Sequence, residues 1–154
     1  MFTSILVGVD RSQHARVALS QAVDIARTQK ASLTVVVAYT TTMPWVSVAP
    51  LSQGAVDEYV AAVRSEADAI ADEARSAIPS ELNADVVVVD EMPAQALLDR
   101  AAAGNHDLIV VGSRGRGDAG SFLLGSVSHA VLHGSRVPVL IVHVPSAEAA
   151  QSNP

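Results

Sequence analysis

The chain has 154 residues, 49% of them hydrophobic and 17% charged, with a net charge of −6 at pH 7 and no cysteine. This length suits one domain, the hydrophobic content is too high for a disordered chain, and the acidic balance argues against a surface for nucleic acid or anionic membranes. The lack of cysteine excludes disulfides, thiolate metal sites and cysteine nucleophiles. No apolar run is long enough to span a bilayer, and the first residues lack the pattern of an export signal, so we expect a cytoplasmic protein.

Short apolar runs rich in valine, isoleucine and leucine predict five strands. Most of these runs are unbroken rather than alternating with polar residues. This pattern is typical of strands covered on both faces, as in a parallel sheet between two layers of helices. The predicted strands are Ile5–Val9, Leu33–Ala38, Val86–Val89, Leu108–Val111 and Val139–Val142.

Longer stretches with helical periodicity separate these runs and predict four helices, at about 12–30, 52–77, 93–104 and 125–134. Ser12 is a favourable N-cap, and Pro93 is favoured in a first turn. The second helix carries one apolar face, made by Val56, Val60, Val63, Ala67 and Ile70. The alternation of strands and helices predicts one α/β domain with right-handed crossovers, spanning 1–146, and a short flexible tail at 147–154.

One long irregular segment, "TTTMPWVSVAPL" at 40–51, precedes the second predicted helix. It holds the single tryptophan, Trp45, between Pro44 and Pro50. Two interpretations are open: a lid or contact surface, or a loop that packs its apolar side chains on the domain. The second is favoured.

A glycine-rich loop follows the fourth predicted strand. Thirteen residues separate Val111 from the helix start at Gly125, whereas such loops usually take about 2–6 residues. Five of the nine glycines lie within 112–125, and glycine lets a ligand approach the backbone closely. The loop leads into a helix N-terminus, where free N–H groups favour an anion. We therefore expect phosphate binding rather than a merely flexible loop.

The side chains around this loop agree with phosphate chemistry. Arg114 and Arg116 stand against Asp118 alone, so the segment is locally positive in an acidic protein. Ser126 and Ser128 lie in the first turn of the following helix, where their hydroxyl groups could donate to phosphate oxygens.

Tighter motifs inside the same stretch are interpreted as coincidence. Residues 115–120 fit GxGxxG, but the helix starts five residues later and no acidic residue lies near position 140, which argues against a dinucleotide enzyme. The P-loop motif is absent, and the tripeptide RGD at 116–118 is a chance match. His129 and His133 have the spacing of zinc ligands without the glutamate of HExxH, which favours a solvated pair on the outer helix face.

Asp10 ends the first predicted strand in "ILVGVDRSQHA". In open α/β sheets, ligands bind beyond the carboxyl ends of strands where the strand order reverses. If the first and fourth strands are adjacent there, Asp10 faces the glycine loop and could bind ribose hydroxyls or a metal. Alternatively, Asp10 shapes the turn before Ser12, and on the residues alone both roles stay open.

The sequence resembles the universal stress protein family, in its ATP-binding branch. The resemblance rests on "ILVGVDRSQHA", on the spacing G-x2-G-x9-G-S at Gly112, Gly115, Gly125 and Ser126, and on "SVSHAVLHGSRVPVLIV". It implies an open five-stranded parallel sheet of order 3-2-1-4-5 with helices on both faces, which is an adenine nucleotide alpha hydrolase-like fold. It also implies a homodimer that pairs through the last strand, and an apolar edge strand at Val139–Val142 needs such cover.

The same resemblance implies one ATP with Mg²⁺ per subunit. The phosphates would lie on the backbone of Gly112, Arg114, Gly115, Gly125 and Ser126, with Val127 and Ser128 close by. Asp10 would hold the ribose, and Val9, Ala38 and Val111 would frame the adenine. Arg11 stands where the family usually has a small residue, which leaves the shape of the first loop open.

These observations favour an ATP-binding regulatory stress-response protein whose occupancy is read by an unidentified regulatory protein. A slow ATPase or phosphotransferase, or an AMP/ATP sensor, are the alternatives. Phosphoryl transfer needs a group that orients the nucleophile. The sequence offers no clear residue for this, so we predict no catalytic residue.

Overall fold

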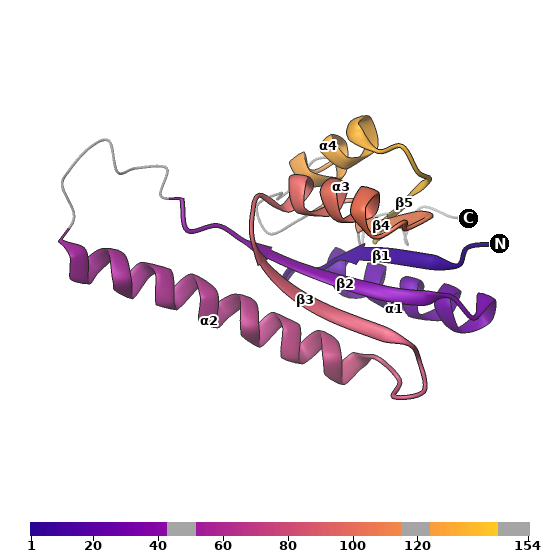
Figure 1. The fold of residues 1–154 in the computed structure, drawn as a ribbon, viewed down its shortest axis with the longest axis horizontal. Coiled ribbons are helices and arrows are strands. Elements are labelled where there is room, and N and C mark those ends of the chain that lie inside the picture. The colour runs from indigo at the N-terminus through magenta and orange to yellow at the C-terminus, as the bar shows by residue number, and fades with distance from the viewer. Residues whose placement is uncertain (43–51, 115–123, 145–154) are drawn as a thin grey trace, which may run out of the picture.

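The computed structural model describes residues 1–42, 52–114 and 124–144. Its centre is a five-stranded parallel sheet in the order β3-β2-β1-β4-β5, which confirms the expected fold (Figure 1). The strands are β1 (Ser4–Gly8), β2 (Ser32–Tyr39), β3 (Ala84–Asp90), β4 (Leu108–Gly112) and β5 (Val139–Val142). The helices are α1 (Gln13–Gln29), α2 (Gln53–Ala77), α3 (Pro93–Ala103) and α4 (Ser126–Gly134).

Some predictions fall outside the described residues. These are the roles of most of segment 40–51, including Trp45, the motifs at 115–120 and the tail at 147–154. They stay predictions.

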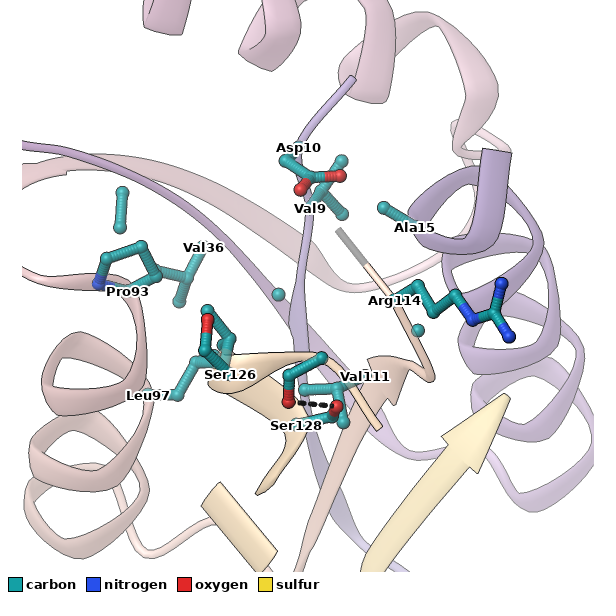
Figure 2. A pocket seen from close by; sticks show the side chains of 15 residues that line it. Val9, Asp10, Ala15, Val36, Pro93, Leu97, Val111, Arg114, Ser126 and Ser128 are labelled. Atoms are coloured by element: carbon teal, nitrogen blue, oxygen red, sulfur yellow. Dashed lines mark hydrogen bonds between the residues drawn. The ribbon is translucent and has the colours of Figure 1, made fainter. Parts of the chain in front are cut away.

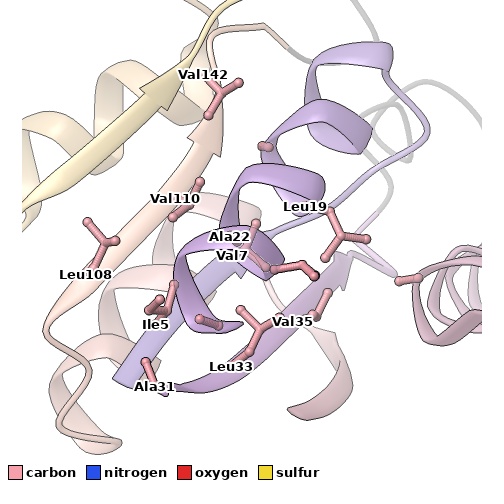
Figure 3. Close-up of a cluster of buried hydrophobic side chains, with 14 residues drawn as sticks. Ile5, Val7, Leu19, Ala22, Ala31, Leu33, Val35, Leu108, Val110 and Val142 are labelled. Atoms are coloured by element: carbon pink, nitrogen blue, oxygen red, sulfur yellow. The ribbon is translucent and has the colours of Figure 1, made fainter. Parts of the chain in front are cut away.

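The helices cover both faces of the sheet (Figure 1). On one face, Ile5 and Val7 of β1 pack with Leu19 and Ala22 of α1 in a buried apolar cluster (Figure 3). On the other face, Leu6 of β1 packs with residues of α3 and α4. Successive strand residues point to opposite faces, so burial of both sets explains why the strands are continuously apolar rather than alternating.

The helix starts follow the predicted capping signals. Ser12 Oγ accepts a hydrogen bond from Ala15 N at 3.0 Å, and Ser52 Oγ accepts one from Ala55 N at 3.3 Å. Pro93 is the first residue of α3, as predicted. At the other end of α1, Lys30 takes the left-handed conformation with φ of 56°, a position more often filled by glycine.

Helix α2 is longer than the sheet it covers, and its first half runs beyond the strands (Figure 1). Twenty-five helical residues span about 37 Å, whereas the seven residues of β3 span about 23 Å. Only Ala67, Ile70, Ala71 and Ala74 of α2 are buried. The apolar face predicted over the whole helix therefore meets the sheet only in its second half, and Val56, Val60 and Val63 are half-buried. Among the described helices, none combines the length and the apolar composition that a membrane crossing requires.

Candidate functional site

A crevice lies at the carboxyl ends of the strands, where β1 and β4 lead to helices on opposite faces of the sheet (Figure 2). This is the switch point at which open α/β sheets bind ligands. The cavity volume is about 210 Å³. Ten of the eleven predicted site residues line it: Val9, Asp10, Ala38, Val111, Gly112, Arg114, Gly125, Ser126, Val127 and Ser128. The eleventh, Gly115, lies outside the described residues.

Five further residues line the crevice that were not predicted from the sequence: Gly8, Ala15, Val36, Pro93 and Leu97. Leu97 and Pro93 come from α3, which packs against the face that carries the crevice. A Cβ on Gly8 would lie 2.8 Å from Leu97 Cδ1, so the missing side chain lets the end of β1 and α3 approach closely. One sequence signal could have indicated Pro93: it follows the third predicted strand closely, so it lies at the same edge of the sheet as Asp10.

The structure shows Asp10 in the turn before α1 and at the wall of the crevice. Its Oδ1 accepts a hydrogen bond from Ser12 N at 2.8 Å, so the carboxylate shapes the turn into α1. Asp10 also lines the crevice. Because one carboxylate oxygen is enough for the turn, the second can serve a ligand. Arg11, next to it, pairs with Glu66 of α2 at 3.3 Å and does not line the crevice.

Ser113 fastens the two ends of the glycine loop together. Its carbonyl accepts from Gly125 N at 2.8 Å and from Ser128 Oγ at 3.1 Å, and its own N–H donates to Val142 O of β5 at 2.8 Å. Ser113 is only 4% exposed. The base of the loop is therefore anchored between β5 and the start of α4. Ser113 was not predicted from the sequence, because a serine among glycines carries no distinctive signal.

The two serines at the start of α4 differ in their surroundings. Ser126 is the exposed first residue of the helix, and the N-cap Gly125 makes no side-chain capping bond. Ser128 is buried, and its hydroxyl lies 3.1 Å from the carbonyl oxygen of Ser113 and 2.9 Å from that of Gly125. The dashed line at Ser128 in Figure 2 marks the contact with Gly125. The Ser128 hydroxyl therefore supports the loop, whereas the Ser126 side chain is exposed at the crevice.

A basic group borders the crevice on the side of α1. Figure 2 shows the Arg114 side chain reaching from the end of β4 toward α1. The ring centroids of His14 and His143 lie 6.1 Å apart. Burial, followed by the positive charges of Arg114 and His143, lowers the pKa of His14, while Asp10 opposes this shift. Sequence reasoning assigned no role to either histidine.

The i, i+4 histidine pair has the geometry of a surface feature. His129 and His133 are both exposed, with ring centroids 4.5 Å apart, and neither lines the crevice. Across the described ranges 1–42, 52–114 and 124–144, no group of three or more histidine, aspartate or glutamate side chains is placed to hold a metal ion.

Together, the sheet order and the crevice at its switch point define a single-domain α/β protein with the adenine nucleotide alpha hydrolase-like fold. The model of the universal stress protein family matches residues 1–143, and the chain belongs to this family.

Individual relatives agree with this assignment. The chain is 34% identical over 147 residues to the universal stress protein YxiE of Bacillus subtilis, covering 92% of this chain and 99% of that protein. Its structure is similar to that of UspA from Lactobacillus plantarum, with a TM-score of 0.66 and 26% identity over 91% of this chain and 97% of the other. It is also similar to a universal stress protein solved in complex with cAMP, with a TM-score of 0.57 and 30% identity over 92% of this chain and 97% of the other.

Proposed function

We propose that this protein binds ATP in the crevice and acts as a regulatory stress-response protein whose nucleotide occupancy is read by a protein partner. The observation that carries the proposal is the convergence of ten predicted nucleotide-site residues on one cavity at the switch point. The relative of similar structure that holds cAMP supports an adenine nucleotide as the ligand class.

Each part of an ATP molecule has a suitable counterpart in the crevice. The apolar side chains of Ala38 and Val111, with Val9, suit the faces of an adenine ring. The Asp10 carboxylate suits ribose hydroxyls, which donate hydrogen bonds to it. The free N–H groups at the start of α4 and the Ser126 hydroxyl suit phosphate oxygens.

Magnesium fits this site as a companion of the phosphates. Mg²⁺ in nucleotide sites is commonly held by one or two carboxylates together with substrate phosphates, and it keeps several waters. Asp10 is the carboxylate among the described lining residues, and its second oxygen could serve either the ribose or the ion. When bound, the ion would neutralise phosphate charge, while the chain's own groups would orient the nucleotide.

We also propose a homodimer through β5 in a cytoplasmic protein. Both β3 and β5 are edge strands, but only the outer edge of β3 has a side-chain donor bonded to it among the described residues. Because Leu33 N bonds to Asn83 O, alternate residues of β3 face β2, and the Val86 carbonyl faces the outer edge. Arg75 Nη2 donates to this carbonyl at 3.2 Å and so blocks that edge. Within the described residues, no comparable donor covers Val139 or Ile141, which leaves β5 for pairing with a second copy.

The substitution Ser126→Asp tests the ATP site by separating folding from binding. A carboxylate in the first turn favours the helix by about 0.3–1 kcal/mol, yet it repels a phosphate at the same place. We expect unchanged or higher stability and at least about tenfold weaker ATP binding by calorimetric titration with Mg²⁺, a loss of roughly 1.4 kcal/mol. The matched control is Gln53→Asp, which adds the same charge at the first residue of α2, away from the crevice.

Nucleotide released by denaturing the purified wild-type protein gives an independent readout. Recovered ATP supports the proposal, and recovered ADP supports the slow-ATPase alternative. The ATP-binding proposal would be contradicted if Ser126→Asp bound ATP as tightly as the wild type does. It would also be contradicted if the wild-type protein showed no ATP binding below about 1 mM.

A further inference from the structure

Three basic side chains from three separate parts of the chain lie close together near the base of the glycine loop. Arg114 lines the crevice, and His14 packs against Gly112, which also lines it. His14 lies in the first turn of α1, Arg114 follows β4, and His143 follows β5. The two imidazole rings are 6.1 Å apart, and Arg114 lines the crevice while its side chain reaches toward α1 (Figure 2). We call His14, Arg114 and His143 the basic cluster.

The acidic groups around the basic cluster do not neutralise it. Asp10 is the acid that acts on His14, and one of its oxygens is already bonded to Ser12 N. Arg114 forms no ion pair with any residue of the described ranges. The other nearby cations face α2: Arg11 pairs with Glu66 and Arg16 pairs with Glu73. Arg114 therefore places a positive charge without an ion pair beside two imidazole groups in a protein of net charge −6.

The His143 ring is also held in place. Its Nδ1 lies 3.1 Å from the hydroxyl of Ser113, the buried residue that fastens the glycine loop. This contact leaves Nε2 free to act on a ligand. Because like charges at short range destabilise a fold unless something offsets them, such an arrangement suits an anion that binds between them.

We propose that the basic cluster binds the phosphates of a nucleotide beyond the first, so that the protein increasingly prefers nucleoside triphosphates over monophosphates as the pH falls. This inference rests on the proposed nucleotide site, because the same molecule must occupy both. Protonated imidazoles donate charge-assisted hydrogen bonds to phosphate oxygens, whereas neutral ones carry no charge.

Binding of a polyphosphate to the basic cluster should be coupled to proton uptake by the protein. In the free protein, burial, Arg114 and His143 lower the pKa of His14, so the ring is largely neutral at neutral pH. An anion beside the ring favours the charged form, and binding of a polyphosphate should therefore take up protons. The terminal phosphate itself titrates near pH 6 in both AMP and ATP. The ratio of the two affinities therefore isolates the contribution of the protein.

The test is calorimetric titration of the whole protein with ATP and with AMP, in EDTA, at about pH 5.5 and about pH 8.0, on either side of the ordinary histidine pKa. We expect the ATP-to-AMP affinity ratio to rise about five- to tenfold at the lower pH. Repeating the ATP titration in buffers of different ionisation enthalpy should show proton uptake. This second readout uses the wild-type protein and needs no variant.

The double variant His14→Gln/His143→Gln should lose the pH-dependent rise while still binding AMP. Glutamine can keep a polar contact with Ser113, and far-ultraviolet circular dichroism checks that the variant folds. The matched control, His129→Gln/His133→Gln, removes an exposed histidine pair of α4 that is not part of the basic cluster and should behave like the wild type. If both nucleotides bind but the ratio is independent of pH, or if the double variant retains the rise, the inference is wrong and the nucleotide site stands. If the wild type binds neither nucleotide, the proposed function itself fails.

Discussion

Replacing Gly112 with alanine tests how closely α1 packs on the end of β4. A Cβ at Gly112 would lie 2.8 Å from both the carbonyl carbon and the Cβ of His14. These atoms belong to the helix backbone or its first side-chain atom, so no flexible side-chain end can move aside. Overpacking of this kind costs about 1–3 kcal/mol, partly offset by the 0.4–1 kcal/mol or so that the lower entropy of the unfolded chain returns.

We therefore expect Gly112→Ala to lower the free energy of unfolding by about 1–2 kcal/mol, measured by urea denaturation. The matched control is Gly54→Ala, in the first turn of α2, where an added Cβ meets nothing within 4 Å. Alanine suits a helix better than glycine, so this variant should be unchanged or more stable by up to about 1 kcal/mol. The two variants should differ by about 2 kcal/mol, or by roughly 1 M in their urea midpoints.

The same substitution should also weaken nucleotide binding, because relief of the contact shifts the start of α1 and, with it, the turn at Asp10 and Ser12. Equal stability of Gly112→Ala and the wild type would refute the packing argument. So would an equal loss in both alanine variants, since that would reflect glycine replacement in general rather than a contact with His14.

Two further predictions concern buried polar groups. Burial, followed by the charge of Arg100, lowers the pKa of His106 against the opposing effect of Asp107, so the folded protein favours the neutral ring, whose Nδ1 lies 2.8 Å from Ser4 Oγ. The stabilisation by the neutral ring is complete above the ordinary pKa of 6.5 and is lost as the pH falls through the lowered value. His106→Gln should therefore reduce the fall in unfolding free energy at acid pH, measured by urea denaturation at a series of pH values. An unaltered fall would mean that other groups cause it. Ser128→Ala should lower the unfolding free energy by about 0.5–1.5 kcal/mol but leave ATP affinity within about twofold, because the buried hydroxyl serves the loop; a large loss of affinity at unchanged stability would show that it contacts the phosphates.

Local patterns in the sequence were sufficient for the secondary structure. Unbroken apolar runs marked the strands, and the capping serines Ser12 and Ser52 and the first-turn proline Pro93 marked helix starts. These signals work because capping and periodicity act over a few neighbouring residues. The overhang of α2 was not visible in this way, because a repeating apolar face does not reveal where the sheet beneath it ends.

The residues of the candidate site also fall into two groups: those that local sequence signals indicate and those that only the tertiary structure shows. Asp10 and the glycine spacing are local signals in the sequence, and the family resemblance that they support implied the ten residues that line one cavity. No such signal marks the crevice wall that Pro93 and Leu97 of α3 form. The same is true of the hydrogen bonds of Ser113 and of the basic cluster. Each depends on which strands are neighbours: Ser113 reaches Val142 and His143 only because β4 and β5 lie side by side.

The sequence by itself thus determined the elements, their order along the chain and the phosphate-binding character of one loop, since these properties arise from interactions between near neighbours. Only the tertiary structure brought His14, Arg114 and His143, which are up to 129 positions apart in the chain, close together near the base of the glycine loop. The strand order of the sheet and the packing of α1 upon it decide which distant residues meet, and no local pattern encodes that choice.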